Sequence, residues 1–143
     1  MSDDFIDSSV ILYLFDETGP AKRAIARRLI DDALLDRDNS STISFQVVQE
    51  VINVILHKYS PPATSQDARQ TLDVILTPLW KVMPSQGLYE RAVTLQSRYG
   101  YRFYDSLIIA AALESGCGRL LSEDLQDGQH IETLTIVNPF LHS

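Results

Sequence analysis

The sequence predicts an α/β fold with three layers (α/β/α), in which helices cover both faces of a mainly parallel sheet of four to five strands. Short apolar runs typical of strands alternate with longer segments of helical periodicity, and few residues separate them. Parallel strands joined by helices produce this alternation. The length of 143 residues and the 45% share of hydrophobic residues suffice for one domain, 1–143, with its own core.

The first half of the chain is predicted to supply two strands and three helices. Residues 5–7 form a short apolar run that ends in an acid, as a strand in such a sheet does. Pro20 suits the first turn of a helix, and Ser44 suits the N-cap of another. The predicted elements are a strand at 5–7, helices at 10–15 and 20–35, a strand at 41–43 and a helix at 45–59.

The second half continues the alternation and contains the most apolar helix. Ser85 and Gly100 are predicted to begin and end one helix. Every residue from 107 to 113 is apolar, so the helix that Gly116 closes has no polar face and is expected to be buried on all sides. The predicted elements are helices at 65–76, 85–100 and 105–113, with strands at 80–83, 120–121 and 134–137.

Four acidic residues have related positions in these elements. Asp7 and Asp124 follow strands, Asp105 precedes the apolar run, and Glu50 is the one acid on the polar stripe of a helix that otherwise carries Gln46, Gln49, Asn53 and His57. Ligands of such sheets bind beyond the carboxyl ends of the strands, so the four carboxylates are predicted to meet at one pole. Taken singly, Asp105 is an ordinary helix cap and Glu50 belongs to an exposed face.

The four acids indicate metal-dependent phosphate chemistry. Oxygen ligands with no Cys and no His nearby in sequence suit Mg²⁺ or Mn²⁺ better than Zn²⁺. Such ions activate water and neutralise the charge of a phosphate. No glycine-rich phosphate loop, His–Cys metal spacing or Ser-His-Asp pattern offers a competing interpretation.

Charge and cysteine content limit the other function classes. The net charge of −7 disfavours a nucleic-acid binder, but without the four candidate acids it is −3. The basic cluster of Lys22, Arg23, Arg27 and Arg28 is either a solvated face or a docking surface for an anionic partner. The lone Cys117 forms no internal disulfide, and no signal segment or apolar run of membrane-spanning length is present. A cytoplasmic protein is expected.

Five segments resemble, in order, the PIN-domain nucleases. They are FIDSSV at 5–10, QVVQE at 46–50, FYDSLIIAAA at 103–112, LLSEDLQDG at 120–128 and IVNPF at 136–140, the last being similar to VapC-type toxins. The resemblance implies that Asp7, Glu50, Asp105 and Asp124 are catalytic metal ligands. It also implies supporting roles for Ser122 and for Ser9, where many members have Asn. Asp127 is expected in a supporting or turn position, since Asp before Gly is common in turns.

The resemblance further implies a Mg²⁺- or Mn²⁺-dependent endoribonuclease, the toxin of a type II toxin–antitoxin pair. Its implied partners are an RNA substrate, a cognate antitoxin protein and a second copy in a homodimer. Arg98 and Arg102 are candidates for phosphate contacts, or pair with surface acids, and Tyr101 or Tyr104 for base stacking. The main alternative is a catalytically silent PIN-like scaffold that binds RNA or a protein. A metal-dependent phosphatase or receiver-like domain is a third; a receiver needs a late lysine, and none follows Lys81.

Overall fold

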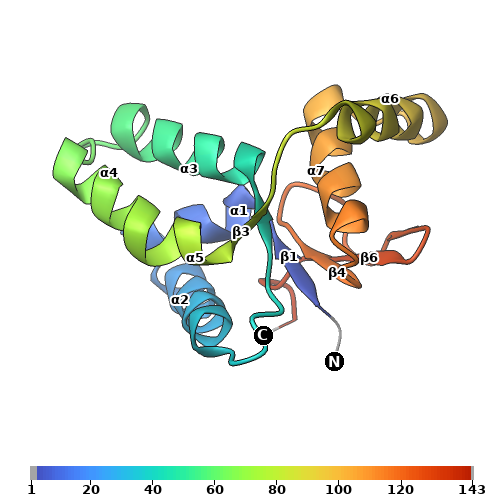
Figure 1. Ribbon diagram of the computed structural model, residues 1–143. Helices are drawn as coiled ribbons and strands as arrows, with labels where there is room; N and C mark the ends of the chain where they lie inside the picture. The colour runs from blue at the N-terminus through green and yellow to red at the C-terminus, as the bar shows by residue number, and fades with distance from the viewer. Residues whose placement is uncertain (1–2, 143) are drawn as a thin grey trace.

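The computed structural model describes residues 3–142 and contains one main sheet surrounded by helices (Figure 1). Strands β1, β4 and β6 are parallel, and β5 pairs antiparallel with β6 in the order β1-β4-β6-β5. The strands are β1 (Asp4–Ile6), β2 (Ile43–Ser44), β3 (Trp80–Val82), β4 (Arg119–Leu121), β5 (His130–Ile131) and β6 (Leu134–Val137). The mainly parallel α/β fold is confirmed.

A second, two-stranded sheet extends the first beyond β1. β2 and β3 pair in parallel, and a parallel bridge joins Phe5 of β1 to Thr42, just before β2. Two backbone hydrogen bonds fasten this junction, from Ile6 N to Thr42 O at 3.0 Å and from Thr42 N to Asp4 O at 2.9 Å. The carboxyl ends of β1, β2 and β4 therefore lie along one edge, as they must in parallel strands.

The helices largely follow the predicted order. They are α1 (Ser8–Ile11), the 3-10 helix η1 (Leu12–Phe15), α2 (Pro20–Leu35), α3 (Phe45–His57), α4 (Ser65–Thr71), the π-helical turn η2 (Leu72–Leu76), α5 (Thr77–Leu79), α6 (Gln86–Tyr99) and α7 (Phe103–Glu114). The predicted helix 65–76 thus continues to Leu79 through a π-helical turn. Among the residues that the structure describes, no helix is long and apolar enough to cross a membrane.

Helix α7 forms the centre of the core. All its residues from Ser106 to Leu113 are buried, as the unbroken apolar run predicted. Gly100 at φ 78° ends α6 in the left-handed conformation, which glycine adopts without strain, and lets the chain turn directly into α7. The helix start that carries Asp105 is therefore held by a rigid, buried element.

Two local predictions were wrong, and one strand was missed. Helix α7 begins at Phe103 with Arg102 as N-cap, so Asp105 lies in the first turn and does not cap the helix. Gln46 is only 5% exposed, because α3 begins against α7 and the Gln46 amide donates to the Tyr104 carbonyl at 3.0 Å. Strand β5 was not predicted, since two residues carry no detectable alternation.

Two predicted caps behave differently, which gives a matched stability test. The Ser85 hydroxyl accepts from Leu88 N at 3.1 Å, whereas the buried Ser44 hydroxyl has no hydrogen-bond partner within residues 3–142. Ser85→Ala is expected to lower the free energy of unfolding by about 1 kcal/mol, because a cap is lost. Ser44→Ala is expected to change it little or raise it, because a buried unpaired hydroxyl is removed. Urea unfolding of both variants measures the difference, and equal losses would contradict it.

Candidate active site

Asp7 is the centre of the polar network at the carboxyl edge of the sheet. It follows β1 directly and is the N-cap of α1, where its Oδ1 accepts from Ser8 N at 2.8 Å. Its backbone N–H donates to Leu121 O at 3.0 Å, which continues the pairing of β1 with β4. The side chain is 6% exposed, so strand and helix together hold a carboxylate inside the protein.

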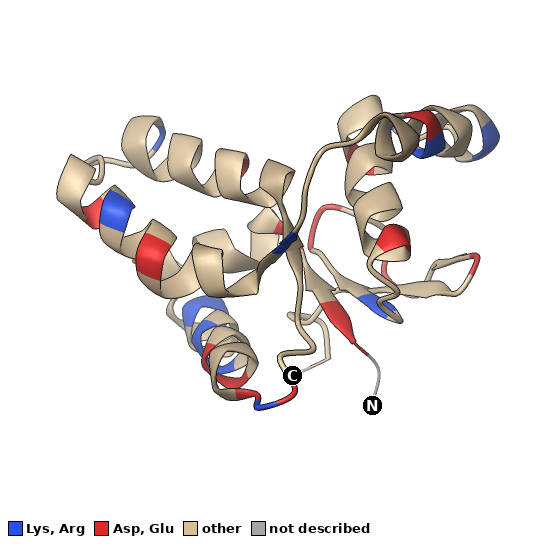
Figure 2. Cartoon of the chain, viewed as in Figure 1, with Lys and Arg blue, Asp and Glu red and all other residues tan. Residues whose placement is uncertain are grey.

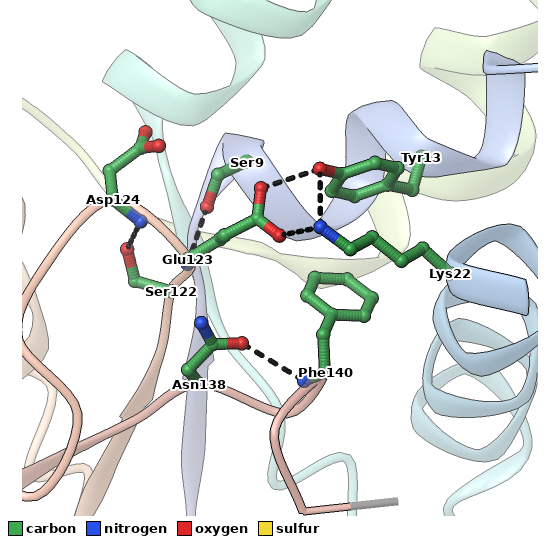
Figure 3. Close-up of polar contacts among 8 residues, drawn as sticks. All are labelled: Ser9, Tyr13, Lys22, Ser122, Glu123, Asp124, Asn138 and Phe140. Atoms are coloured by element: carbon green, nitrogen blue, oxygen red, sulfur yellow. Dashed lines mark hydrogen bonds and ion pairs between the residues drawn. The ribbon is translucent and has the colours of Figure 1, made fainter. Parts of the chain in front are cut away.

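Two serine hydroxyls connect Asp7 to the segment that follows β4. Ser122 Oγ donates to Asp7 Oδ2 at 2.8 Å, and Ser9 Oγ donates to the same oxygen at 3.2 Å. Each hydroxyl also accepts from a backbone N–H of that segment, Ser122 from Asp124 at 3.2 Å and Ser9 from Glu123 at 3.1 Å (Figure 3). The segment carrying Asp124 is therefore hydrogen-bonded to Asp7 through both serines.

Glu50 and Asp105 reach the same pole from two other helices. Ser8 Oγ donates to Glu50 Oε2 at 2.6 Å, which links α3 to the residue beside Asp7. Asp105 lies one residue after Tyr104, whose carbonyl accepts from Gln46 at the start of α3. Both side chains are partly exposed. Glu50 is thus hydrogen-bonded to the residue beside Asp7, whereas Asp105 is linked to the other acids through its charge, which acts on Asp124.

The electrostatics link the acids to one another. Burial is the largest cause that raises the pKa of Asp7, and the charges of Glu50 and Asp124 add to it. Against the lowering effect of the hydrogen bonds from Ser122 and from Ser8 N, the result is a pKa of about 6. Burial also raises the pKa of Asp124, followed by the charges of Asp105 and Glu123. A carboxylate whose neighbours are acids is destabilised in its charged form, and a cation between them would relieve this.

The donor chemistry of the site fits a hard divalent cation. Asp7, Glu50, Asp105 and Asp124 offer only oxygen, the ligand that Mg²⁺ and Mn²⁺ prefer. Their side chains do not form a closed ligand set, because within residues 3–142 no three Asp, Glu, His or Cys side chains are placed to hold one ion together. The fit therefore rests on the oxygen donors and on the mutual repulsion of the acids.

The other predicted site residues have varied surroundings. Asp127 accepts from Asn138 N at 2.8 Å and contacts His142, so it fastens the loop after β4 to the chain after β6 and takes no part in the hydrogen bonds of Asp7. Arg98 and Arg102 are exposed, and in the described part of the chain neither forms an ion pair. Tyr104 is 70% exposed, whereas Tyr101 is half-buried and donates to Gln129.

Four polar residues of the network were not predicted from the sequence. Ser8 bridges to Glu50, and Glu123 contacts Tyr13 and Lys22. The doubled serine after Asp7 was a signal for Ser8. Glu123 adjoins Asp124, but nothing in the sequence indicates its partners, which lie more than 100 residues away.

Removal of the Ser122 hydroxyl is expected to raise the pKa of Asp7 above about 6. Hydrogen bonds to a carboxylate favour its charged form, and Ser122 supplies the 2.8 Å donor. Ser122→Ala should also lower the free energy of unfolding at pH 7 by roughly 1–3 kcal/mol, since a buried charge loses a partner. Carbon-13 NMR titration of the Asp7 carboxyl checks the first effect. Ser115→Ala, which removes a hydroxyl bonded to Ala112 O, is the control and should leave that pKa unchanged.

Comparisons with known proteins agree with this architecture. The PIN domain family model matches residues 5–126. A toxin–antitoxin complex from Klebsiella pneumoniae contains a similar fold, with a TM-score of 0.68 and 23% identity over 95% of this chain and 97% of that one. The crystal structure of Mycobacterium tuberculosis VapC20, a sarcin–ricin loop cleaving toxin, is similar with a TM-score of 0.62 and 19% identity over 85% and 91%. No curated protein matches. Because the family model covers most of its length, the chain belongs to the PIN-domain family.

Proposed function

We propose that this protein is a Mg²⁺- or Mn²⁺-dependent endoribonuclease of the VapC type. The observation that supports the proposal is the electrostatic linkage of the acids. Besides burial, the charges of Glu50 and Asp124 raise the pKa of Asp7, and the charge of Asp105 contributes to the raised pKa of Asp124. The fold similarity to VapC20, described as cleaving the sarcin–ricin loop, supports RNA as the substrate class.

The residues of this chain have distinct roles in the proposed reaction. The four carboxylates would hold the cation, which when bound lowers the pKa of water and neutralises the scissile phosphate. Ser9 and Ser122 orient Asp7 through Oδ2, and Ser8 orients Glu50, so that the carboxylates keep fixed directions. Rigid placement of the acids before substrate arrives reduces the reorganisation that the reaction requires.

RNA contacts are proposed beside the start of α7. Arg102 precedes Asp105 by three residues, and Arg98 lies in the last turn of α6, before the Gly100 turn that leads into α7. Both are exposed, and Tyr104 presents an exposed ring of the kind on which unpaired bases stack. Because the overall charge is −7, phosphate binding depends on local cations such as Arg98 and Arg102.

An antitoxin is the proposed protein partner. A cavity of about 830 Å³ lies between η1, the end of α3 and the α4–η2 segment, with apolar residues such as Phe15, Ile55 and Ile75 in its lining. It shares Asp16 and Tyr59 with a smaller cavity of about 350 Å³ that Glu50 and Asp124 line. A partner segment with apolar anchors in the first cavity would reach the acids with a cationic side chain. Figure 2 shows the basic cluster of α2 as successive blue bands on that helix.

A homodimer is proposed through α6. Tyr89 and Val93 lie one turn apart on its outer face and are both exposed, and Met83 is exposed just before the helix. Exposed apolar side chains that gather on one face indicate a protein contact. Sedimentation of the protein with Val93→Glu is expected to show dissociation, and an unchanged mass would argue against this face.

Cleavage of total RNA tests the central proposal. The purified protein is incubated with Mg²⁺, with Mn²⁺ and with excess chelator, and the new RNA ends are mapped. Discrete ends that appear with the ions and disappear with chelator are expected. Unchanged cleavage in chelator would refute metal dependence, and binding without cleavage in either ion would favour the silent scaffold. Expression of the chain alone should arrest growth, and harmless high-level expression would contradict the toxin assignment.

A further inference from the structure

Glu123 lies at the centre of a polar cluster outside the set of acids. Its Oε1 accepts from the Tyr13 hydroxyl at 2.5 Å and its Oε2 accepts from Lys22 Nζ at 2.6 Å (Figure 3). Lys22 also donates to the Tyr13 hydroxyl at 3.3 Å. Burial raises the pKa of Glu123, but the hydrogen bonds from Lys22 and Tyr13 outweigh this and hold it below its usual value. The carboxylate is therefore charged and has two partners.

Tyr13 and Lys22, the two partners of Glu123, are themselves held in place by aromatic contacts. The Tyr13 and Phe140 rings meet edge to face with centroids 4.8 Å apart. Lys22 Nζ lies 5.1 Å from the Tyr13 centroid and 5.7 Å from the Phe140 centroid, within the range of cation–π attraction. Phe140 is held through its backbone N–H, which donates to Asn138 Oδ1 at 2.9 Å. The cluster thus joins η1, the beginning of α2 and the end of the chain.

The segment after β4 is consequently held from two sides. On one side the backbone N–H groups of Glu123 and Asp124 bond to Ser9 and Ser122, which both bond to Asp7. On the other side the Glu123 side chain bonds to Tyr13 and Lys22. Asp124 itself is exposed, and only its backbone is held by these bonds. The direction of the Asp124 side chain therefore depends on how rigidly the backbone of residues 122–124 is held.

We infer that Glu123 is a positioning residue, which together with Tyr13 and Lys22 holds the Ser122–Asp124 segment so that Asp124 faces the other acids. The inference rests on the proposed function, because it assigns the cluster a role in cation binding by Asp124. It predicts that each member of the cluster contributes to cation affinity, although none is among the proposed metal ligands.

A purely electrostatic role makes the opposite prediction for Lys22. Glu123 is the neighbour of Asp124 in the chain, so its charge lies close to the proposed cation site whether or not its side chain is held. If this charge alone attracted the cation, Lys22→Met would remove a competing positive charge and tighten Mn²⁺ binding. If Lys22 acts by holding Glu123, the same variant weakens Mn²⁺ binding. Tyr13→Phe leaves every charge unchanged and keeps the ring against Phe140, so electrostatics predicts no effect and positioning predicts a loss.

The experiment combines two measurements on the protein without RNA. Mn²⁺ affinity is measured by titration calorimetry, and the amide hydrogen exchange of Glu123 and Asp124 is measured in chelator. Lys22→Met and Tyr13→Phe are each expected to weaken Mn²⁺ binding about tenfold, the size seen when supports of metal ligands are removed. Both should also speed exchange of the two amides by roughly tenfold, because the segment opens more often. Glu123→Gln combined with Tyr13→Phe should be no worse than the more severe single variant.

Arg23→Met is the matched control. Arg23 is the next cation along α2, and in the described residues it forms no ion pair and no hydrogen bond with Glu123. It should leave amide exchange at 123 and 124 unchanged and should not weaken Mn²⁺ binding. Tighter binding by Lys22→Met, or unchanged exchange in both cluster variants, overturns the inference. If the unaltered protein binds no Mn²⁺, the proposed function fails, and the exchange measurement alone then decides whether the cluster holds the segment.

Discussion

Asp105→Asn is expected to reduce metal-dependent RNA cleavage by roughly 100-fold or more, which corresponds to about 3 kcal/mol of transition-state stabilisation. The substitution removes one charged oxygen ligand from the proposed site. It should leave the fold intact, since Arg102 is the N-cap of α7 and the Gln46 amide holds the Tyr104 carbonyl at that helix start. Cleavage rates with Mg²⁺, together with thermal melts in chelator, separate the loss of activity from a loss of stability.

Asp73→Asn is the control for this result. Asp73 is an exposed acid in η2, so the variant makes the same chemical change away from the candidate site. It should cleave RNA at the rate of the unaltered protein. Equal activity of Asp105→Asn and Asp73→Asn would remove Asp105 from the proposed ligand set. Loss of activity in Asp105→Asn accompanied by a large fall in melting temperature would contradict the expectation that charge and structure are separable there.

Asp7→Asn is expected to raise the stability of the metal-free protein at pH 7 by roughly 1–3 kcal/mol. The folded-state pKa of Asp7 is about 6, against an ordinary value of 3.8, and a rise of this size corresponds to roughly 3 kcal/mol. Asn relieves the buried charge and is as good an N-cap as Asp. The serine hydroxyls at Oδ2 can rotate to accept from the new amide, but their O–H groups then lose the Asp7 acceptor. This loss is the reason why the expected gain is smaller than the full electrostatic effect.

The pH dependence of this effect follows from the direction of the pKa shift. A raised folded-state pKa means that the folded protein binds the Asp7 proton more tightly than the unfolded chain does. The stability that the folded protein gains from this tighter proton binding is fully present below about pH 4, and it is lost as the pH rises through about 6. The advantage of Asp7→Asn should therefore disappear below about pH 4. Urea unfolding of both proteins between pH 3 and 8, in the presence of chelator, measures it.

The same unfolding experiment is repeated with Mg²⁺, to compare how much the ion stabilises the unaltered protein and Asp7→Asn. A cation that binds only the folded state stabilises by about 2.7 kcal/mol at 100 times its dissociation constant, and Asp7→Asn should lose most of this. Asp36→Asn is a control of opposite sign, because hydrogen bonds from Ser40 lower the pKa of Asp36. The Asp36→Asn protein should be slightly less stable than the unaltered protein at pH 7, and Mg²⁺ should stabilise it as much as it stabilises the unaltered protein. Destabilisation by Asp7→Asn in chelator, with an unchanged Mg²⁺ effect, would show that Asp7 acts only as a cap.

The sequence by itself determined the order and type of most elements. The apolar run from 107 to 113 predicted a helix buried on all sides, and the structure buries all of it. Pro20 and Gly100 predicted helix boundaries that the structure places at the same residues. These signals are local: they depend on backbone conformations and on the period of apolar residues, which a short segment carries alone. The strand ends also predicted that acids gather at the carboxyl edge.

Only the tertiary structure decided which contacts each polar side chain makes. Asp7 caps a helix whereas Asp105 does not, Gln46 is buried by α7, and Glu123 is paired with a tyrosine and a lysine more than 100 residues away. Local periodicity carries no information about such partners, because they depend on how distant elements pack. Burial then sets the electrostatics, since it is the largest cause that raises the pKa of Asp7 to about 6.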